Sequence, residues 1–148
     1  MEVHVYKTRE CFVPLAEIKR AVLLASKLEK KIKGSVEIGV ISKKEIKDIN
    51  RRYRGINKST DVLSFAWQED KFILSNPKKQ PQNQPLGQLY LCPEIIEEHA
   101  KRFEVTKKEE FFRMLIHGML HLVGYDHDLP GRAKKMFSLQ EKILENIM

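Results

Sequence analysis

The sequence lacks the features that would place it in a membrane or outside the cell. No apolar run approaches the roughly 20 residues that a membrane-spanning helix needs, and the longest candidate is residues 21–25. The first five residues lack the basic and then apolar pattern of a secretory signal. The two cysteines, Cys11 and Cys92, are far apart and form no C-x-x-C unit, so we expect buried thiols and not a disulfide. These absences predict a cytoplasmic protein.

Composition favours one globular domain with an anionic partner. The 148 residues are 42% hydrophobic, which argues against disorder and fits a single domain spanning 1–148. Lysine and arginine number 27 against 20 acidic residues, a formal charge of +7. A basic surplus favours polyanions such as nucleic acids, because neutralised phosphates release their counterions. Each basic cluster can equally be a solvated helix face; the clusters are residues 30–33, 51–54 and 132–135.

Three of the five histidines fall within residues 117–127. His117 and His121 lie four apart in an apolar, helix-like run, so they share one helix face and can bind one ion. Gly124 can take positive φ and end the helix, which returns His127 to the same ion. Three histidines leave a fourth tetrahedral position for water, as in catalytic zinc sites. Taken alone, the first pair can also be core histidines.

The spacing also matches the metalloprotease signature H-E-x-x-H-x-x-G-x-x-H, with one difference. Where those proteases carry the glutamate that acts as general base, this chain has Gly118. The sequence therefore predicts the metal site of such an enzyme without the base of a peptidase.

Periodicity and capping signals predict an α+β fold with one small sheet of about four strands, packed by about five helices. The metal-bearing helix lies near the carboxyl end. We expect strands at residues 2–7, 36–41, 61–67 and 86–91. We expect helices from Pro14 to about Lys33 (Ile18, Val22, Ala25 and Leu28 on one face), 43 to about 52, 93–103, about 107–121 and 130–147.

Two capping boxes and one polar segment complete this assignment. Ser42 with Glu45, and Thr106 with Glu109, have the spacing in which each side chain bonds the other residue's backbone N–H. Residues 76–85 are polar and contain three prolines, so we expect a mobile surface loop inside the domain and not a linker between domains.

A second group of polar residues precedes the third predicted strand. Asp61 and Ser64 have side chains that commonly close turns by bonding backbone N–H groups, and direct chemistry is the alternative. Arg54 is predicted to lie in a loop and not on a solvated helix face. Its planar guanidinium can hold two phosphate oxygens, although a plain surface arginine is an equal alternative.

Together these segments resemble the bacterial YbeY family. The matching motifs are N-x-x-Y-R…T-D-V-L-S-F, at residues 50–54 and 60–65, and H-G-x-L-H-L-x-G-Y-D-H, at residues 117–127. The resemblance implies a metal-dependent endoribonuclease for single-stranded RNA. It implies action on ribosomal RNA of the small subunit, in maturation of its 3′ end and in ribosome quality control. It also implies zinc on His117, His121 and His127, with Arg54 and His117 as catalytic residues.

One departure from the family concerns the strand after the polar segment. Relatives usually have Gly-Asp where this chain has Gly87-Gln88, so the role of that aspartate is in doubt here. Asp126, next to a predicted ligand, is a candidate acceptor for an imidazole N–H, or a simple surface aspartate.

Two alternatives to the nuclease come from other classes of protein. Zinc lowers the pKa of bound water to about 7, so a nuclease needs no glutamate base. A metallopeptidase-like zinc hydrolase needs that base, and Gly118 argues against it. A non-catalytic ribosome-assembly factor with structural zinc needs a fourth protein ligand, and none is in view.

Overall fold

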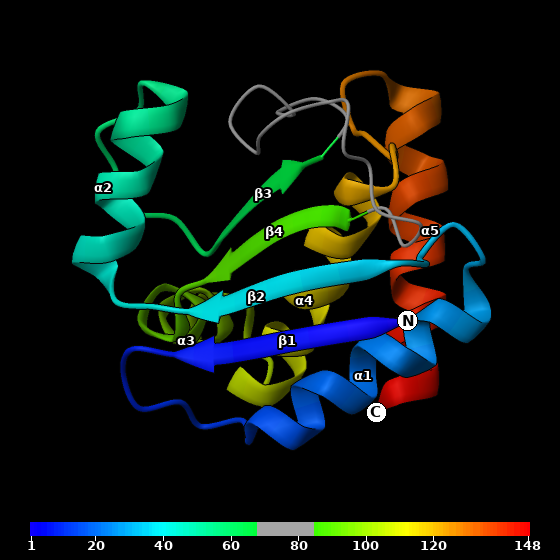
Figure 1. Cartoon of the computed structure of the whole chain (residues 1–148), viewed down its shortest axis with the longest axis horizontal. Helices are drawn as coiled ribbons and strands as arrows, with labels where there is room; N and C mark the ends of the chain where they lie inside the picture. Colours follow the sequence, from blue (N-terminus) through cyan, green and yellow to red (C-terminus); the bar gives the residue numbers. More distant parts are fainter. Residues whose placement is uncertain (68–84) are drawn as a thin grey trace.

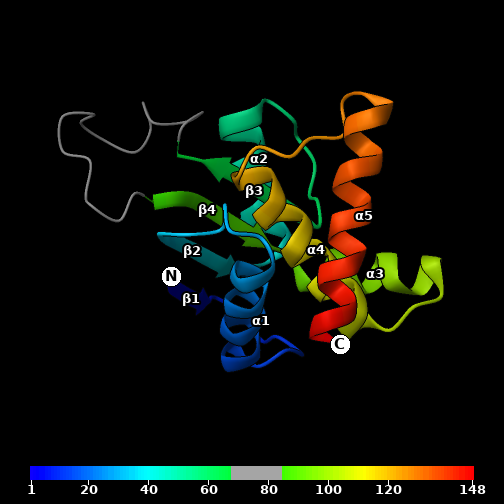
Figure 2. The ribbon, with the colours of Figure 1, turned by 90° about the vertical axis from the view of Figure 1, so that its right-hand side faces the viewer.

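The structure is a computed structural model that describes residues 1–67 and 85–148. One sheet forms a layer, and helices α1, α4 and α5 lie on one side of it (Figures 1 and 2). The strands are β1 (Glu2–Lys7), β2 (Ser35–Val40), β3 (Val62–Ala66) and β4 (Pro85–Leu91). The helices are α1 (Leu15–Leu28), α2 (Lys43–Arg54), α3 (Pro93–Phe103), α4 (Lys107–Leu122) and α5 (Pro130–Ile147). The predicted α+β domain of four strands and five helices is confirmed.

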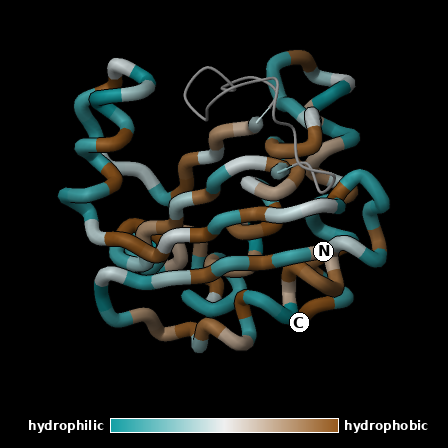
Figure 3. Tube along the Cα trace, in the orientation of Figure 1, coloured by the Kyte–Doolittle hydropathy of each residue, from teal (hydrophilic) through white to brown (hydrophobic). Residues whose placement is uncertain are grey.

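The sheet has the order β1-β2-β4-β3. This order places β3 at one edge of the sheet. Strands β1, β2 and β4 are parallel, and β3 runs antiparallel to β4. Alternate residues of the two central strands are buried beneath the helices: Val36, Ile38, Val40, Leu89 and Leu91. Figure 3 shows hydrophobic stretches alternating with more hydrophilic ones along the strands, the pattern of a sheet with one covered face.

Helix α4 packs against this sheet through its glycine. A Cβ atom added to Gly118 would lie 2.2 Å from Cδ1 of Leu89 and 3.1 Å from Cγ2 of Val62. Real Cβ atoms do not approach that closely, so a larger residue at position 118 would force the Leu89 side chain or α4 to shift. The glycine that replaces the protease glutamate therefore faces the sheet.

Replacing Gly118 by alanine should destabilise the fold. The new methyl group overpacks the core at Leu89, which costs about 1–3 kcal/mol, against up to about 1 kcal/mol gained from helix propensity. Gly131 in the first turn of α5 is the matched control, because nothing lies within 4 Å of its added Cβ. Urea unfolding should show a loss for Gly118→Ala and none for Gly131→Ala. Equal stability of the two variants would contradict this packing.

The two predicted capping boxes differ in outcome. At α2, the Ser42 hydroxyl accepts from the Glu45 N–H and the Glu45 carboxylate accepts from the Ser42 N–H, so the full box is present. At α4, Thr106 accepts from the Glu109 N–H, but the Glu109 carboxylate bonds Arg113 instead of the cap. An ion pair one turn further along thus replaces half of the predicted box.

Helix α1 ends five residues before the predicted Lys33. Glu29 leaves the helical conformation, and its carboxylate accepts hydrogen bonds from the Lys31 N–H and the Tyr125 hydroxyl. The segment that follows buries Ile32. Leu28 is 44% exposed, so its predicted place on the buried face is wrong. The Glu29 side chain thus bonds the turn after α1 and a residue far along the chain instead of continuing the helix.

The remaining sequence predictions concern surface and covalent features. Both cysteines are free, as predicted; Cys92 is buried as expected, whereas Cys11 is only half-buried. The predicted mobile loop at residues 76–85 lies, apart from Pro85, outside the described residues. Within the described chain, none of the helices is both long and apolar enough to span a bilayer.

Candidate metal centre and cleft

The three histidines are brought together by the end of α4. Gly124 has φ of +100°, and its N–H donates to the His121 carbonyl, while the Tyr125 N–H donates to the Leu120 carbonyl. These paired bonds form a Schellman motif, which ends the helix and reverses the chain. The reversal returns His127 to the helix face that carries His117 and His121. The Tyr125 hydroxyl, 2.7 Å from the Glu29 carboxylate, ties the turn to the end of α1.

The three rings meet at their nitrogens. One ligand nitrogen from each of His117, His121 and His127 lies within 4.8 Å of the other two. Nε2 of His117 and Nε2 of His121 are 3.1 Å apart. Two nitrogens bound to one zinc ion at about 2.0–2.1 Å in tetrahedral geometry would lie about 3.3 Å apart. Among the described residues, this is the one group of three or more potential ligands that converges in this way.

The hydrogen bonds of the half-buried rings of His117 and His121 indicate which nitrogen of each can bind a cation. Nδ1 of His121 lies 2.9 Å from the Tyr125 carbonyl, and Nδ1 of His117 lies 2.7 Å from Oε1 of Gln140. Both oxygens are acceptors, so each Nδ1 carries the proton and each Nε2 presents a lone pair. Two lone pairs that face each other at 3.1 Å repel unless a cation lies between them. The donor set therefore fits a metal ion.

Electrostatics favour the ligating form of both rings. Burial lowers the pKa of His117, and the neighbouring His127 lowers it further, although the bond to Gln140 opposes this. Burial, then His117 and His127, lower the pKa of His121. Neutral imidazole is the form that binds metals, so little free energy is needed to deprotonate these rings at neutral pH.

Arg54 reaches the same region from the opposite side. It is the last residue of α2, so its predicted place in a loop is wrong. Its Nη2 donates to the Ser64 carbonyl at 2.7 Å, and its guanidinium lies 4.6 Å from the centre of the Phe65 ring. These contacts hold the charge of Arg54 against the outer edge of β3.

A cleft of about 420 Å³ lies between Arg54 and the histidines. Its lining comes from the end of α2, from β3, from α4 and from the turn after α4. The described residues that line it are Arg54, Asp61, Val62, Leu63, Ser64, Ala66, Met114, His117, His121, Gly124, Tyr125, Asp126 and His127. The structure thus places the predicted ligands, the arginine and Asp126 around one cavity.

The structure shows the contacts of Asp126, Asp61 and Gln88, whose roles the sequence left open. The Asp126 carboxylate accepts from the His127 backbone N–H at 2.7 Å, so it shapes the turn, and the protons of the two half-buried rings go to other acceptors. Asp61 accepts from the Val62 N–H, as expected for a turn-closing residue. Gln88 pairs with Phe65 across the sheet, on the face away from Leu89 and α4.

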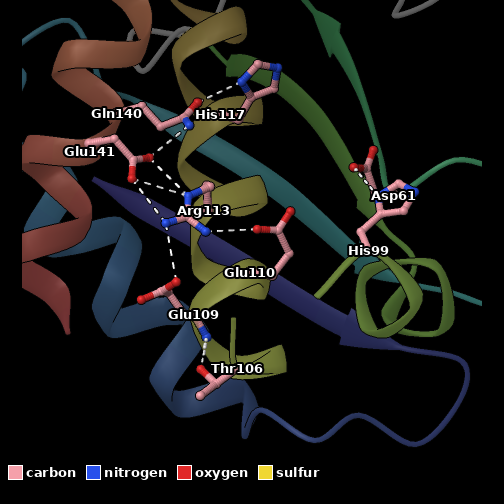
Figure 4. A network of polar contacts seen from close by, with 9 residues as sticks. All are labelled: Asp61, His99, Thr106, Glu109, Glu110, Arg113, His117, Gln140 and Glu141. Carbon is pink, nitrogen blue, oxygen red and sulfur yellow. Dashed lines mark hydrogen bonds and ion pairs between the residues drawn. The ribbon is translucent and has the colours of Figure 1, made fainter. Parts of the chain in front are cut away.

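Sequence reasoning missed two residues near this cleft. Gln140 of α5 is 4% exposed and accepts the His117 proton. His99 of α3 has Nδ1 at 3.2 Å from the Asp61 carboxylate. Figure 4 shows both contacts. Neither residue belongs to a motif, and the spacing of α5 marks Gln140 only as a polar residue among core positions.

The whole chain matches proteins of one family. A family model described as endoribonuclease YbeY matches residues 6–148. The chain belongs to this family, and the resemblance carried by its motifs is confirmed. A Thermotoga maritima protein named endoribonuclease YbeY is 38% identical over 130 residues, which cover 84% of this chain and 78% of the relative. One of the same name from Lactobacillus gasseri is 38% identical over 128 residues, 83% of this chain and 73% of the relative.

A solved structure shares the fold. The solution structure of a Thermotoga maritima protein matches with a TM-score of 0.64 and 28% sequence identity. The match covers 98% of this chain and 88% of the other chain. The arrangement of sheet and helices that positions the cleft is therefore found in a second protein.

Replacing Gly124 by alanine should weaken zinc binding if the three histidines hold zinc as the sequence predicts. An alanine at positive φ costs about 1–2 kcal/mol, and relaxation of the turn would carry His127 away from the other two rings. We expect a loss of affinity of about tenfold, the lower end of the effect of losing outer support for a ligand. Zinc titration against a competing chelator measures it.

Gly55 offers the matched control. It follows α2 with φ of +72° and, like Gly124, has nothing within 4 Å of an added Cβ. Gly55→Ala should lose similar stability and keep its zinc affinity. The same zinc affinity in both variants would show that the turn does not position His127.

Proposed function

We propose that this chain is a zinc-dependent endoribonuclease specific for single-stranded RNA, acting on the 3′ end of small-subunit ribosomal RNA and in ribosome quality control. The observation that carries the proposal is the convergence of three histidine nitrogens on a cleft lined also by Arg54. Membership in the YbeY endoribonuclease family supports RNA as the substrate, and a net charge of +7 suits a polyanion. The cytoplasmic location stays a prediction.

His117, His121 and His127 would hold the ion, and the described residues bring no fourth ligand to it. Bound zinc supplies a Lewis acid and lowers the pKa of its bound water to about 7. Gln140 orients the His117 ring and the Tyr125 carbonyl orients the His121 ring, each by accepting the Nδ1 proton. These contacts keep the Nε2 atoms directed at a common point, so the site needs little rearrangement on binding.

Arg54 would bind the phosphate of the scissile bond. Its guanidinium keeps its charge at any physiological pH, and the Phe65 ring and Ser64 carbonyl hold it in the cleft wall. A positioned cation at this place stabilises the negative charge that develops on phosphorus oxygens during cleavage. The pairing of Arg54 with the histidines across one cleft therefore favours phosphodiester chemistry.

The two alternative functions fit this geometry less well. In a metallopeptidase the residue after the first histidine supplies the base, but Gly118 faces Leu89, and a larger side chain there would meet the sheet. A structural zinc site needs a fourth protein ligand, and the described residues bring together three.

RNA cleavage should depend on both metal and His117. We expect the protein to cut an internally labelled, end-blocked single-stranded RNA, and to leave the corresponding duplex and casein intact. A chelator should abolish cleavage, and zinc should restore it. His117→Ala should lose cleavage and zinc together, because the ion would lose one of three ligands. Gel analysis of products and metal content of each variant are the measurements.

His4→Ala is the control for the histidine substitution, since His4 lies on the exposed face of β1. This variant should cleave like the unchanged protein. Metal-dependent proteolysis without RNA cleavage would overturn the proposal in favour of a peptidase. Zinc binding without any turnover would favour the assembly factor, and cleavage that survives in His117→Ala would reveal a contaminating nuclease.

Arg54→Ala should lower the rate of RNA cleavage by about 10²–10³-fold, the effect of losing one preorganised donor. Zinc content and folding should remain unchanged, because the Ser64 carbonyl and the Phe65 ring hold the guanidinium at β3, whereas the three histidines come from α4 and the turn that follows it. Arg54→Lys should restore activity only in part, since lysine offers a point charge without the planar fork.

Arg52→Ala removes the same charge from the same end of α2, where the side chain is exposed. Single-turnover cleavage rates of Arg54→Ala, Arg54→Lys and Arg52→Ala separate a catalytic role of Arg54 from a general attraction of RNA by positive charge. A similar small loss in Arg52→Ala and Arg54→Ala would assign Arg54 to general attraction of RNA, and would remove it from the catalytic site.

A further inference from the structure

A partly buried charge network lies one helical turn before His117. The Arg113 guanidinium contacts three carboxylates, with Nη1 at 2.9 Å from Glu110, Nη2 at 3.4 Å from Glu109 and Nε at 3.1 Å from Glu141 (Figure 4). Glu110 is only 3% exposed. Two carboxylates come from α4 and the third from α5, so Arg113 joins the two helices. Burying the Glu110 charge costs desolvation energy, and the pair of Arg113 with the half-exposed Glu141 adds little stability, so stabilisation alone is a weak explanation of the network.

The network continues to the histidine cluster through Gln140. The Glu141 carboxylate accepts from Nε2 of Gln140 at 3.2 Å. Oε1 of Gln140 in turn accepts from Nδ1 of His117 at 2.7 Å. Every bond in this chain has one possible direction as long as Glu141 is ionised, because a carboxylate only accepts. The hydrogen bonds with Arg113 lower the pKa of Glu141 and keep it ionised at neutral pH.

The direction of these bonds decides whether His117 can bind a metal. The two ends of the Gln140 amide have nearly the same shape but opposite hydrogen-bonding character. With its oxygen toward His117, the ring keeps its proton on Nδ1 and presents a lone pair on Nε2. With its NH₂ group toward His117, Nδ1 must accept, the proton moves to Nε2, and the lone pair facing His121 is lost.

We propose that Arg113 and Glu141 are positioning residues, which set the Gln140 amide and through it the metal-binding tautomer of His117. The inference rests on the proposed function, in which His117 is a zinc ligand. The His121 ring needs no such network to set its tautomer. Nδ1 of His121 faces a backbone carbonyl, which can only accept a hydrogen bond. The tautomer of His121 should therefore not depend on Glu141, and it serves as an internal reference for that of His117.

Glu141→Gln tests the proposal with a change of one atom. An amide at position 141 offers a donor as well as an acceptor, so it no longer specifies which end of Gln140 faces His117. In zinc-free protein, ¹⁵N NMR of the imidazole rings should show His117 shifting from the Nδ1–H form to a mixture of tautomers, with His121 unchanged. Zinc affinity, from competition with a chelator, should fall by about tenfold.

Glu145→Gln is the matched control, being the same substitution one turn further along α5. Its exposed side chain has no hydrogen bond or ion pair with the part of the chain that the structure describes. This variant should keep the tautomer and the zinc affinity of the unchanged protein. If Glu141→Gln matches it in both measurements, the network is only a helix clamp and the proposal is wrong.

The two readouts also separate this proposal from the proposed function. A wild-type protein that binds no zinc would overturn the metal centre, while the tautomer measurement would still decide the role of Glu141. A lower melting temperature of Glu141→Gln with an unchanged His117 tautomer would overturn the positioning role even if zinc binding weakened.

Discussion

The site depends on how closely α4 lies against β3 and β4. Gly118 lets the backbone of α4 approach the Leu89 side chain more closely than a residue with a Cβ atom could without a shift of its neighbours. His117 and His121 lie roughly 60–100° around the helix from Gly118, so they face the cleft beside the edge of the sheet instead of the core. The buried hydrophobic residues around this contact make the position rigid. A helix displaced by the width of a methyl group would present both rings to a different place.

Much of this arrangement could be predicted because its signals are local. The strands and helices follow from alternation, helical spacing and caps, and the meeting of three histidines follows from a four-residue spacing and one glycine. In the motif at residues 117–127, the turn and the ligands are adjacent in sequence, so no knowledge of the rest of the fold was needed. Family membership then connected the motif to RNA.

What the sequence could not predict depends on contacts between distant segments. Glu29, where α1 ends early, is hydrogen-bonded to Tyr125, which is 96 residues away. The partner of His117 is 23 residues further along, on a helix whose rotation depends on tertiary packing. The failed half of the second capping box shows the same effect on a smaller scale, since Glu109 has two possible partners and the ion pair with Arg113 prevails. Local sequence patterns limit which hydrogen-bond partners a side chain can have, and tertiary packing determines which of these partners it contacts.

Strand β3 stands at the edge of the sheet, directly beside the cleft. An edge strand exposes backbone groups that can pair with a strand of another molecule and lead to aggregation. Here the Arg54 guanidinium occupies the Ser64 carbonyl on that edge and places a full positive charge beside it. A second copy of this basic chain would meet like charge and a blocked acceptor, whereas a polyanion would meet attraction. One side chain therefore blocks an acceptor that an added strand would use and places a positive charge on the wall of the cleft.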